Sequence, residues 1–307
     1  MIYTLTSDPS LDLIVKLPHF REAAVNRTED ETVVLGGKGL NVSQVLSTFG
    51  VPNVALGFVA GFTGDEIEKR AREKKIRTSF IRLEKGVSRI NIKMISNKTE
   101  TAINARGPVI SKKAKQLLQK KLSMLNENDM LVISGNAPAS NLFYREILKP
   151  IAKKHIPFVV DASGELLKNC ISLHPFIIKP NIHELSEIFH HSIKTKKDCI
   201  RYAKKLQTAG ARNVLLSLGK GGAILVSENN QVYSASAPHC TLVNSVGAGD
   251  AMLAGFIASF IKTHDAEKSL AVSVCTGTAK AASIDFPSRQ KILSLIKKYE
   301  GVHYEHY

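Results

Sequence analysis

The chain has 307 residues and a formal net charge of +15, and its four cysteines include no Cys-x-x-Cys pair. This spacing argues against a zinc site or a disulfide framework, no apolar run approaches the roughly 18–20 residues of a membrane span, and the amino terminus lacks the segments of a signal peptide. We therefore expect a cytoplasmic protein with free, buried or half-buried thiols and no membrane partner.

Short apolar runs alternate with helical patterns along the chain. The expected strands are 2–6, 54–59, 130–134, 158–161, 176–179, 214–217 and 223–226. The expected helices are 41–49, 65–74, 111–125, 143–154, 183–190, 197–208, 248–262, 266–282 and 288–298. The alternation predicts an α/β fold with a doubly wound, mostly parallel sheet and helices on both faces. Ligands of such sheets bind at the carboxyl ends of the strands, where Ser134, Asp161 and Ser217 stand.

Two regions interrupt this alternation. Segments 11–17 with 31–35, and 89–96 with 99–105, have the period of strands without helices between them, and Asn97-Lys98 suits a hairpin turn. We expect a small antiparallel β-lid, formed by about 11–35 and 88–106, on a single domain spanning 1–307. A sheet of this kind has to bury one face against a ligand, the main domain or another subunit.

The basic charge raises the alternative of a nucleic-acid binder, which would bind duplexes with a steep salt dependence. In the helix expected at 111–125, lysines alternate with an apolar stripe, which is typical of a solvated helix face. The chain has no helix-turn-helix, zinc-finger or aromatic RNA-binding signature. We therefore expect no nucleic-acid partner.

The segment 244–250, with the sequence NSVGAGD, follows an apolar run and opens a strongly periodic helix. Backbone N–H groups at a helix N-terminus bind anions, and Gly247 and Gly249 let a phosphate approach the backbone. Asp250 would then take a proton from a hydroxyl during phosphoryl transfer. The helix dipole favours its anionic form, so Asp250 would be a weak base that acts mainly by position. The alternative is that Asp250 only caps the helix.

Two further glycine-rich turns flank lysines. Gly36-Gly37-Lys38-Gly39 leads into a helix, and Gly219-Lys220-Gly221-Gly222 follows a strand. Neither is a Walker A loop, because no Ser or Thr follows the lysine, and no Gly-x-Gly-x-x-Gly follows the first strand. These turns therefore indicate neither a P-loop nor a dinucleotide site.

Together, the segments 36–42, 179–185 (KPNIHEL), 217–223 (SLGKGGA) and 244–256 resemble the ribokinase/PfkB sugar-kinase family, in the order of its motifs. The resemblance implies a ribokinase-like fold. Segments 9–12, 26–27, 89–93, 99–100 and 161–164, with Asn104 and 107–108, are most similar to the 1-phosphofructokinase branch, with tagatose-6-phosphate kinases as neighbours.

The resemblance implies an enzyme that uses ATP and Mg²⁺ to phosphorylate a ketohexose phosphate. Fructose 1-phosphate is the first choice of substrate and tagatose 6-phosphate the second. A catalytically silent sugar-phosphate sensor is the alternative from a different class of protein. The resemblance also suggests a homodimer whose two lids pair, and lid closure would exclude water from the site.

The resemblance assigns a role to each matching residue. Asp250 would be the base, and the backbone of Gly247, Ala248 and Gly249 would hold the transferring phosphoryl group. The sugar hydroxyls would bind Asp12, Gly37 and Asn41, and the sugar's phosphate would bind Arg27, Lys38, Arg89 and Ser134. On the nucleotide side, Asn181 and Glu184 would organise the phosphates and Mg²⁺, with Glu184 acting through water. The nucleotide pocket would be lined by Ser217, Gly219 and Gly222 and bordered by Asn244 and Cys275.

Three residues depart from this pattern. Asp8 stands where this branch usually carries Asn, Asn136 stands where Ser is usual, and Arg106 is an additional cation. Each of them bears on which sugar phosphate fits.

Overall fold

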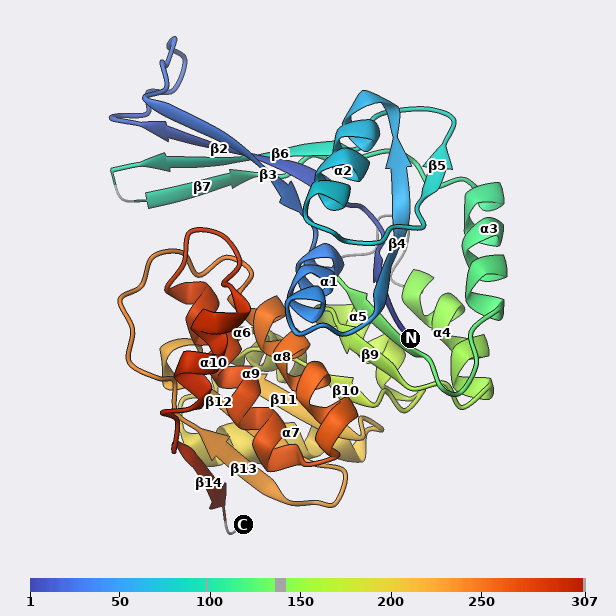
Figure 1. Cartoon of the computed structure of the whole chain (residues 1–307), viewed down its shortest axis with the longest axis vertical. Helices are drawn as coiled ribbons and strands as arrows, with labels where there is room; N and C mark the ends of the chain where they lie inside the picture. Colours follow the sequence, from blue (N-terminus) through green and yellow to red (C-terminus); the bar gives the residue numbers. More distant parts are fainter. Residues whose placement is uncertain (98, 136–141, 306–307) are drawn as a thin grey trace.

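The computed structural model describes residues 1–97, 99–135 and 142–305. Its main sheet contains β1 (Ile2–Thr6), β4 (Asn53–Ala60), β5 (Ile81–Leu83), β8 (Met130–Ser134), β9 (Phe158–Asp161), β10 (Ile177–Ile178), β11 (Asn213–Ser217), β12 (Ala223–Val226), β13 (Val232–Ala235) and β14 (Val302–Glu305). The strand order is β14-β13-β12-β11-β10-β9-β8-β1-β4-β5 (Figure 1). The strands from β5 to β11 in this order pair in parallel, and β12, β13 and β14 add antiparallel pairs. The expected mostly parallel sheet is confirmed.

Helices cover both faces of this sheet. They are α1 (Lys38–Thr48), α2 (Gly61–Glu73), α3 (Lys112–Ser123), α4 (Phe143–Lys153), α5 (Gly164–Ile171), α6 (Ile182–Phe189), α7 (Lys196–Thr208), α8 (Ala248–Thr263), α9 (Ala266–Ala281) and α10 (Arg289–Ile296). Alternate strand residues face opposite layers: Leu131 and Ile133 join a core with α3 to α7, and Met130 and Val132 join a core with α1, α8 and α9. The sheet is therefore doubly wound, as expected.

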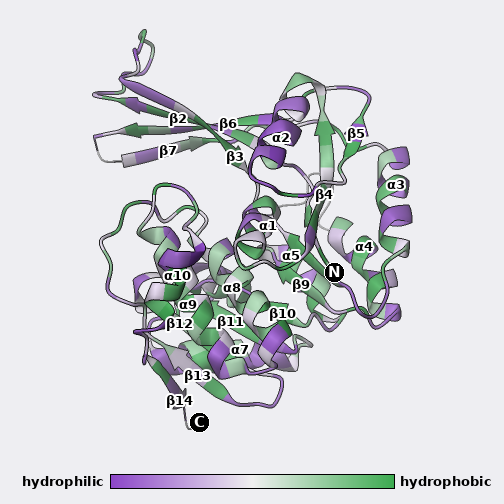
Figure 2. Cartoon of the chain, viewed as in Figure 1, coloured by the Kyte–Doolittle hydropathy of each residue, from purple (hydrophilic) through white to green (hydrophobic). Residues whose placement is uncertain are grey.

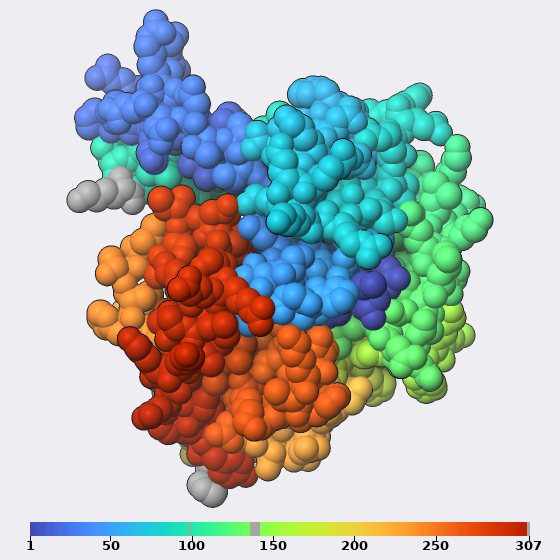
Figure 3. Space-filling view, in the orientation of Figure 1, coloured from blue at the N-terminus to red at the C-terminus, as the bar shows by residue number. Residues whose placement is uncertain are grey.

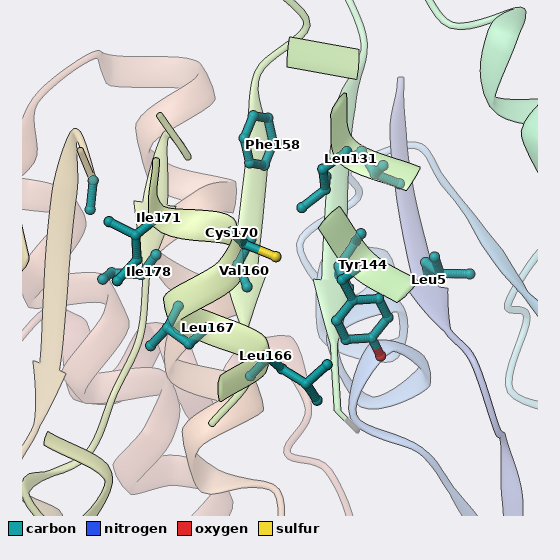
Figure 4. Close-up of a cluster of buried hydrophobic side chains, with 14 of the residues drawn as sticks. Leu5, Leu131, Tyr144, Phe158, Val160, Leu166, Leu167, Cys170, Ile171 and Ile178 are labelled. Carbon is teal, nitrogen blue, oxygen red and sulfur yellow. The ribbon is translucent and has the colours of Figure 1, made fainter. Parts of the chain in front are cut away.

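The helix α5 is not among the expected helices. Its side chains Leu166, Leu167, Cys170 and Ile171 are buried against β9 and β10 (Figure 4). Their spacing is helical, but the segment is only eight residues long. Tertiary packing, rather than intrinsic helix stability, holds so short a helix.

A separate sheet forms the lid. It contains β2 (Ser10–Leu17), β3 (Asp30–Gly36), β6 (Arg89–Ser96) and β7 (Thr99–Ile103), in the order β3-β2-β6-β7. The outer pairs are antiparallel, but the central pair, β2 with β6, is parallel. The expected small lid sheet is confirmed, with two antiparallel pairs and a parallel central pair. The chain passes through the main domain between β2 and β6, so these two strands are not joined as a hairpin. The lid stands out from the body, beside the C-terminal segments (Figure 3).

The strand register divides the lid into two faces. The polar face carries Asp12 and its neighbour Asn91. The apolar lid face consists of Leu11, Leu13, Val15, Leu17, Val33, Leu35, Ile90, Ile92, Met94 and Ile103. Helix α2 covers the end of this face next to Leu11, whereas Val33 and Ile103 are 36% and 56% exposed. Part of the apolar lid face therefore lacks a cover in the single chain.

Hydrophobic colour follows the strands of the main sheet, and α2 and α3 show hydrophilic colour (Figure 2). Within the described ranges, no helix has the length and apolar character needed to cross a bilayer. The four cysteines are free thiols, three of them buried and Cys240 partly exposed, as expected.

Candidate active site

The parallel strands bring charged side chains to one edge of the main sheet. Asp161 ends β9, and Lys179 directly follows β10. Asp161 is 1% exposed, and the ammonium groups of Lys179 and Lys38 lie 3.4 and 3.7 Å from its Oδ1. Burial acts to raise the pKa of Asp161, but the two ammonium groups outweigh it and hold the pKa below its usual range. Asp161 is therefore an anion that orients two cations.

The glycine turn before α8 lies against this charge cluster. Gly247 is the N-cap, with a φ of 79°, and no side chain caps the helix. The Ala248 N–H donates to the Ser245 oxygen at 3.1 Å, so the first turn offers the N–H groups of Gly249 and Asp250 to an anion. The ammonium of Lys179 lies 3.1 Å from the position that a Cβ on Gly249 would take. The helix N-terminus and Lys179 together fit a phosphoryl group.

Asp250 lies in the first turn of α8 and is 5% exposed. The Nδ2 of Asn41 donates a hydrogen bond of 2.8 Å to its Oδ2. Burial, together with the charge of Asp161, raises the pKa of Asp250 to about 6, while Lys38 and the Asn41 hydrogen bond act to lower it. The pKa shift is opposite in direction to the one expected from the helix dipole, because burial and the Asp161 charge dominate. Asp250 is a stronger base than the sequence indicated.

The raised pKa predicts the pH dependence of catalysis. A carboxylic acid accepts a proton only when it is ionised, so with Asp250 as the expected base kcat/KM should fall about tenfold per pH unit below a pKa near 6. Asn41→Ala removes a hydrogen bond that favours the ionised form, and it should move this acid limb to higher pH. The measurement is kcat/KM from pH 5 to 8.

Asp8 is the other carboxyl group that could produce such an acid limb, because burial raises its pKa to about 6 against the lowering effect of Arg89. The profile is assigned to Asp250, and Asp8 serves as the control. Asp8→Asn should therefore keep the acid limb. Loss of the limb in Asp8→Asn would assign it to Asp8 and contradict the role of Asp250.

The polar face of the lid orients Asp12. The Ser10 hydroxyl and the Asn91 amide each donate a hydrogen bond of 2.8 Å to Oδ1 of Asp12. A Cβ on Gly36 would lie 2.3 Å from the Ser10 Oγ and 2.6 Å from this Oδ1, so only glycine fits there. Asp12 is thus a fixed acceptor, suited to sugar hydroxyls.

Arg89 and Asp8 form an ion pair at the base of the lid, with 2.8 Å between Nη1 and Oδ2. Asp8 is 7% exposed, and the Arg89 Nε is buried without a hydrogen-bond partner in the described ranges. The departure at position 8 therefore places a carboxylate that anchors Arg89. Arg106 is exposed, and Asn136 lies outside the described residues.

The four residues expected to bind the sugar's phosphate do not form one cluster. Lys38 pairs with Asp161, whereas Arg89 pairs with Asp8. Ser134 is fully buried, and its hydroxyl has no partner among the residues described. Arg27 is exposed in the loop between β2 and β3; this loop lies at the far end of the lid (Figure 1). A cluster of all four within one chain is not observed.

The expected nucleotide side begins at the N-terminus of α6. Asn181 and Glu184 form a capping box: the Asn181 Oδ1 accepts from the Glu184 N–H, and the Glu184 Oε2 accepts from the Asn181 N–H. Ser217 pairs with Asn181 in a parallel bridge. Gly219 and Gly222 turn the chain from β11 into β12, and a Cβ on Gly222 would lie 1.9 Å from the Ala235 oxygen.

Cys275 does not border an open site. Its side chain in α9 is fully buried, and burial raises the pKa of its thiol to about 12. Asn244 is partly buried in the loop before Gly247, and its amide donates to the Ile284 oxygen. The expectation for Cys275 is therefore corrected, whereas Asn244 lies beside the glycine turn 247–249 at the start of α8, here called the phosphoryl turn.

Glu184, at the N-terminus of α6, is a carboxylate suited to binding Mg²⁺ on the expected nucleotide side. Glu184 is near enough to Lys38 to contribute, after Asp161 and Asp250, to raising the pKa of that lysine. Within the described part of the chain, no three His, Cys, Asp or Glu side chains form a metal cluster. Mg²⁺ usually takes one or two carboxylates together with substrate phosphates and water. Glu184 fits that mode of binding.

Asp161, Lys179 and Asn91 are site residues that were not assigned roles from the sequence. A signal for two of them was present, because Asp161 and Lys179 both stand at the carboxyl ends of apolar strands. Asn91 belongs to the segment 89–93 of the family resemblance, but its contact with Asp12 depends on the pairing of β2 with β6.

Comparison with known proteins identifies relatives along the whole chain. A model of the pfkB family carbohydrate kinases matches residues 8–284. A 1-phosphofructokinase of Borreliella burgdorferi is 39% identical over 302 residues, which cover 97% of this chain and 98% of that protein. A D-tagatose-1-phosphate kinase of Bacillus licheniformis is 38% identical over 260 residues, which are 84% of each chain. The crystal structure of a proposed phosphofructokinase from Staphylococcus aureus has a TM-score of 0.85 at 33% identity, covering 99% of this chain and 98% of that one.

Proposed function

Because the chain belongs to the pfkB family of carbohydrate kinases, we propose that it transfers the γ-phosphoryl group of ATP to the 6-hydroxyl of fructose 1-phosphate. The product would be fructose 1,6-bisphosphate. The observation that carries this proposal is the buried Asp250 beside the uncapped N-terminus of α8 and the Lys179 ammonium. A base, an anion site and a cation thus lie together at one sheet edge.

Each of these groups has a role in the transfer. Asp250 accepts the proton of the sugar hydroxyl as that oxygen attacks phosphorus. The N–H groups at the start of α8, with Lys179 and Lys38, stabilise the negative charge of the transferring group. Asp161 holds both lysines. Glu184 would help to hold Mg²⁺, which would supply further neutralisation of the phosphate charges. Asp12 orients the sugar through its hydroxyls.

A phosphorylated sugar is favoured by Arg89. Its guanidinium lies at the base of the lid, held by Asp8, and its buried Nε lacks a partner among the described residues. A guanidinium fork suits a phosphate that the substrate already carries. The relatives of this chain named 1-phosphofructokinase and D-tagatose-1-phosphate kinase agree with this substrate class.

Tagatose 1-phosphate is the second candidate, because the relative from Bacillus licheniformis is named for it. Both sugars carry their phosphate on C1, so Arg89 could serve either one. Discrimination between them would depend on contacts with ring hydroxyls, which Asp12 and Asn41 provide.

The test is ATP turnover with Mg²⁺ against fructose 1-phosphate, tagatose 1-phosphate, tagatose 6-phosphate and fructose 6-phosphate. We expect the highest kcat/KM with fructose 1-phosphate. A higher value for another sugar would replace the substrate and leave the reaction in place. Binding of a sugar phosphate without any turnover would favour the sensor and overturn the proposal.

We also propose that two chains pair through the apolar lid face. Its uncovered part includes Val33 and Ile103, and burying such side chains stabilises association. The protein should therefore have about twice its 33.6 kDa mass at micromolar concentration. Val33→Glu should shift it towards the monomer, as measured by sedimentation or light scattering.

Thr32→Glu is the matched control, because Thr32 pairs with Ile14 on the opposite face of the lid. It should leave the mass unchanged. A monomeric mass for the unmodified chain across the micromolar range would rule out this dimer.

A further inference from the structure

Lys280 is a buried lysine that the proposed reaction does not use. It lies near the end of α9, and the residue is 2% exposed. Its ammonium donates to the backbone oxygens of Asn244, Ser283 and Ile284, at 3.3, 3.4 and 3.5 Å. The ring of Phe286 lies 5.5 Å from it. Three N–H donors thus meet three backbone carbonyls and an aromatic face.

No carboxylate in the described ranges forms an ion pair with Lys280. Asp285 is close enough to raise the pKa of Lys280 against the lowering effect of burial, but its Oδ2 lies 2.7 Å from the Lys74 ammonium. The partners of the Lys280 charge are therefore carbonyl dipoles, together with the negative end of the α9 dipole.

These contacts connect directly to the phosphoryl turn. The N–H groups of Val243 and Asn244 donate to the Ala281 oxygen at 2.8 and 3.0 Å, and the Asn244 side chain accepts from the Val246 N–H at 3.0 Å. A Cβ on Gly247 would lie 2.9 Å from the Phe286 ring. Lys280 therefore ties together the two segments, 243–246 and 283–286, that hold Gly247 in place.

A lysine near a helix C-terminus often binds the carbonyls of its own helix end. That role explains the contacts with Ser283 and Ile284, which are three and four residues away. It explains neither the almost complete burial nor the contact with Asn244, which is 36 residues away in the sequence. Carbonyl oxygens around an aromatic face are instead a suitable environment for a small monovalent cation.

We propose that the Lys280 ammonium takes the place of a bound monovalent cation and keeps the Gly247–Gly249 turn in its anion-binding conformation. Lys280 is a positioning residue for phosphoryl transfer, and this inference rests on the proposed function. The unmodified enzyme consequently needs neither K⁺ nor NH₄⁺ for activity. Removing the side chain creates a carbonyl-lined space that a free cation can fill.

The experiment compares the unmodified protein with Lys280→Ala in chloride salts of K⁺, NH₄⁺ and tetramethylammonium, the last being too large for the space. The unmodified enzyme should have the same kcat in all three salts. Lys280→Ala should lose about tenfold or more in kcat in tetramethylammonium, or 1.4 kcal/mol, and recover most of it in K⁺ or NH₄⁺. The KM for the sugar should change little.

Lys291→Ala is the matched control. The exposed ammonium of Lys291 donates to the Ala282 oxygen and the Ser283 hydroxyl at 2.5 and 2.8 Å, in the same segment. This variant should show no cation dependence. An unmodified enzyme that requires K⁺, or a folded Lys280→Ala whose loss no cation restores, would overturn the proposal.

A second readout does not need turnover. K⁺ and NH₄⁺ should raise the Tm of Lys280→Ala relative to tetramethylammonium, and they should not do so for the unmodified protein. If no sugar is phosphorylated but this stabilisation appears, the proposed function fails while the cation replacement stands. If neither protein responds to the small cations, the replacement is wrong. If Lys280→Ala does not fold, the unmodified protein still tests the proposal. A turnover or a Tm of the unmodified protein that depends on K⁺ or NH₄⁺ would overturn it.

Discussion

Asp250→Asn should lower kcat by about 10²–10⁴, the usual contribution of a positioned base, while the sugar phosphate still binds. Asn cannot accept the proton, but its amide has the size of the carboxylate and can keep the contact with Asn41. The measurement is kcat from ATP turnover, together with sugar binding by calorimetry.

The same substitution should not destabilise the protein. Burial raises the pKa of Asp250 from 3.8 to about 6, so its folded-state pKa lies above its unfolded-state value. The ionised group therefore opposes folding at pH 8, by about 3 kcal/mol. Asp250→Asn removes that cost, and its free energy of unfolding at pH 8 should rise. A variant that is both inactive and unfolded would contradict this account.

Asp129→Asn is a matched control at the other end of the sheet. Asp129 is 8% exposed and lies 3.2 Å from the N-terminal ammonium, just before β8. Because it is far from the strand ends that form the site, its replacement should preserve kcat. Equal losses of kcat in both variants would show that burial, rather than the position of Asp250, matters.

Lys179→Met is the second large effect that we expect. The substitution removes the ammonium beside Gly249 and takes one of the two cations away from buried Asp161. Removing a hydrogen-bond donor that stabilises the negative charge of the transferring phosphoryl group lowers kcat by a factor on the order of 10²–10³. The substitution also lowers stability, because the buried Asp161 anion loses one partner. A buried charge left with no partner costs about 3–5 kcal/mol. Lys38 remains beside Asp161, so the loss should be smaller than that.

A double substitution separates these two effects. In Asp161→Asn with Lys179→Met, the buried anion is gone, so most of the lost stability should return. Activity should not return, because the phosphoryl group still lacks Lys179. Urea unfolding and kcat, measured on the two single variants and the double variant, test this. Recovered activity in the double variant would show that Lys179 only neutralises Asp161.

Local patterns predicted much of this fold. The bounds of β1, β8, β9 and β12 match the expected segments residue for residue, because apolar period and flanking turn residues are properties of neighbouring positions. The α/β class follows from strand–helix alternation, the ribokinase-like fold is implied by four motifs in family order, and family membership confirms it. The positions of the Gly247 turn and of Asp250 at the start of α8 follow from the same local signals.

Other elements depended on distant partners. β5 has only three residues and carries too little pattern to be distinguished from a loop, and β13 was not among the expected strands. The parallel pairing of β2 with β6 is decided by how the chain returns from the main domain. Such elements are stabilised by the surface on which they pack, which a local window does not contain.

The sequence by itself determined the family, the fold class and the segments that meet at the strand ends. Only the tertiary structure decided the charge states and partners there: Asp161 between Lys38 and Lys179, Asp8 with Arg89, and Lys280 among backbone carbonyls. It also showed that Cys275 is fully buried and that Asp250 has a raised pKa. The physical reason is that backbone conformation responds to neighbours in sequence, whereas desolvation and Coulomb interactions depend on residues brought together from across the chain.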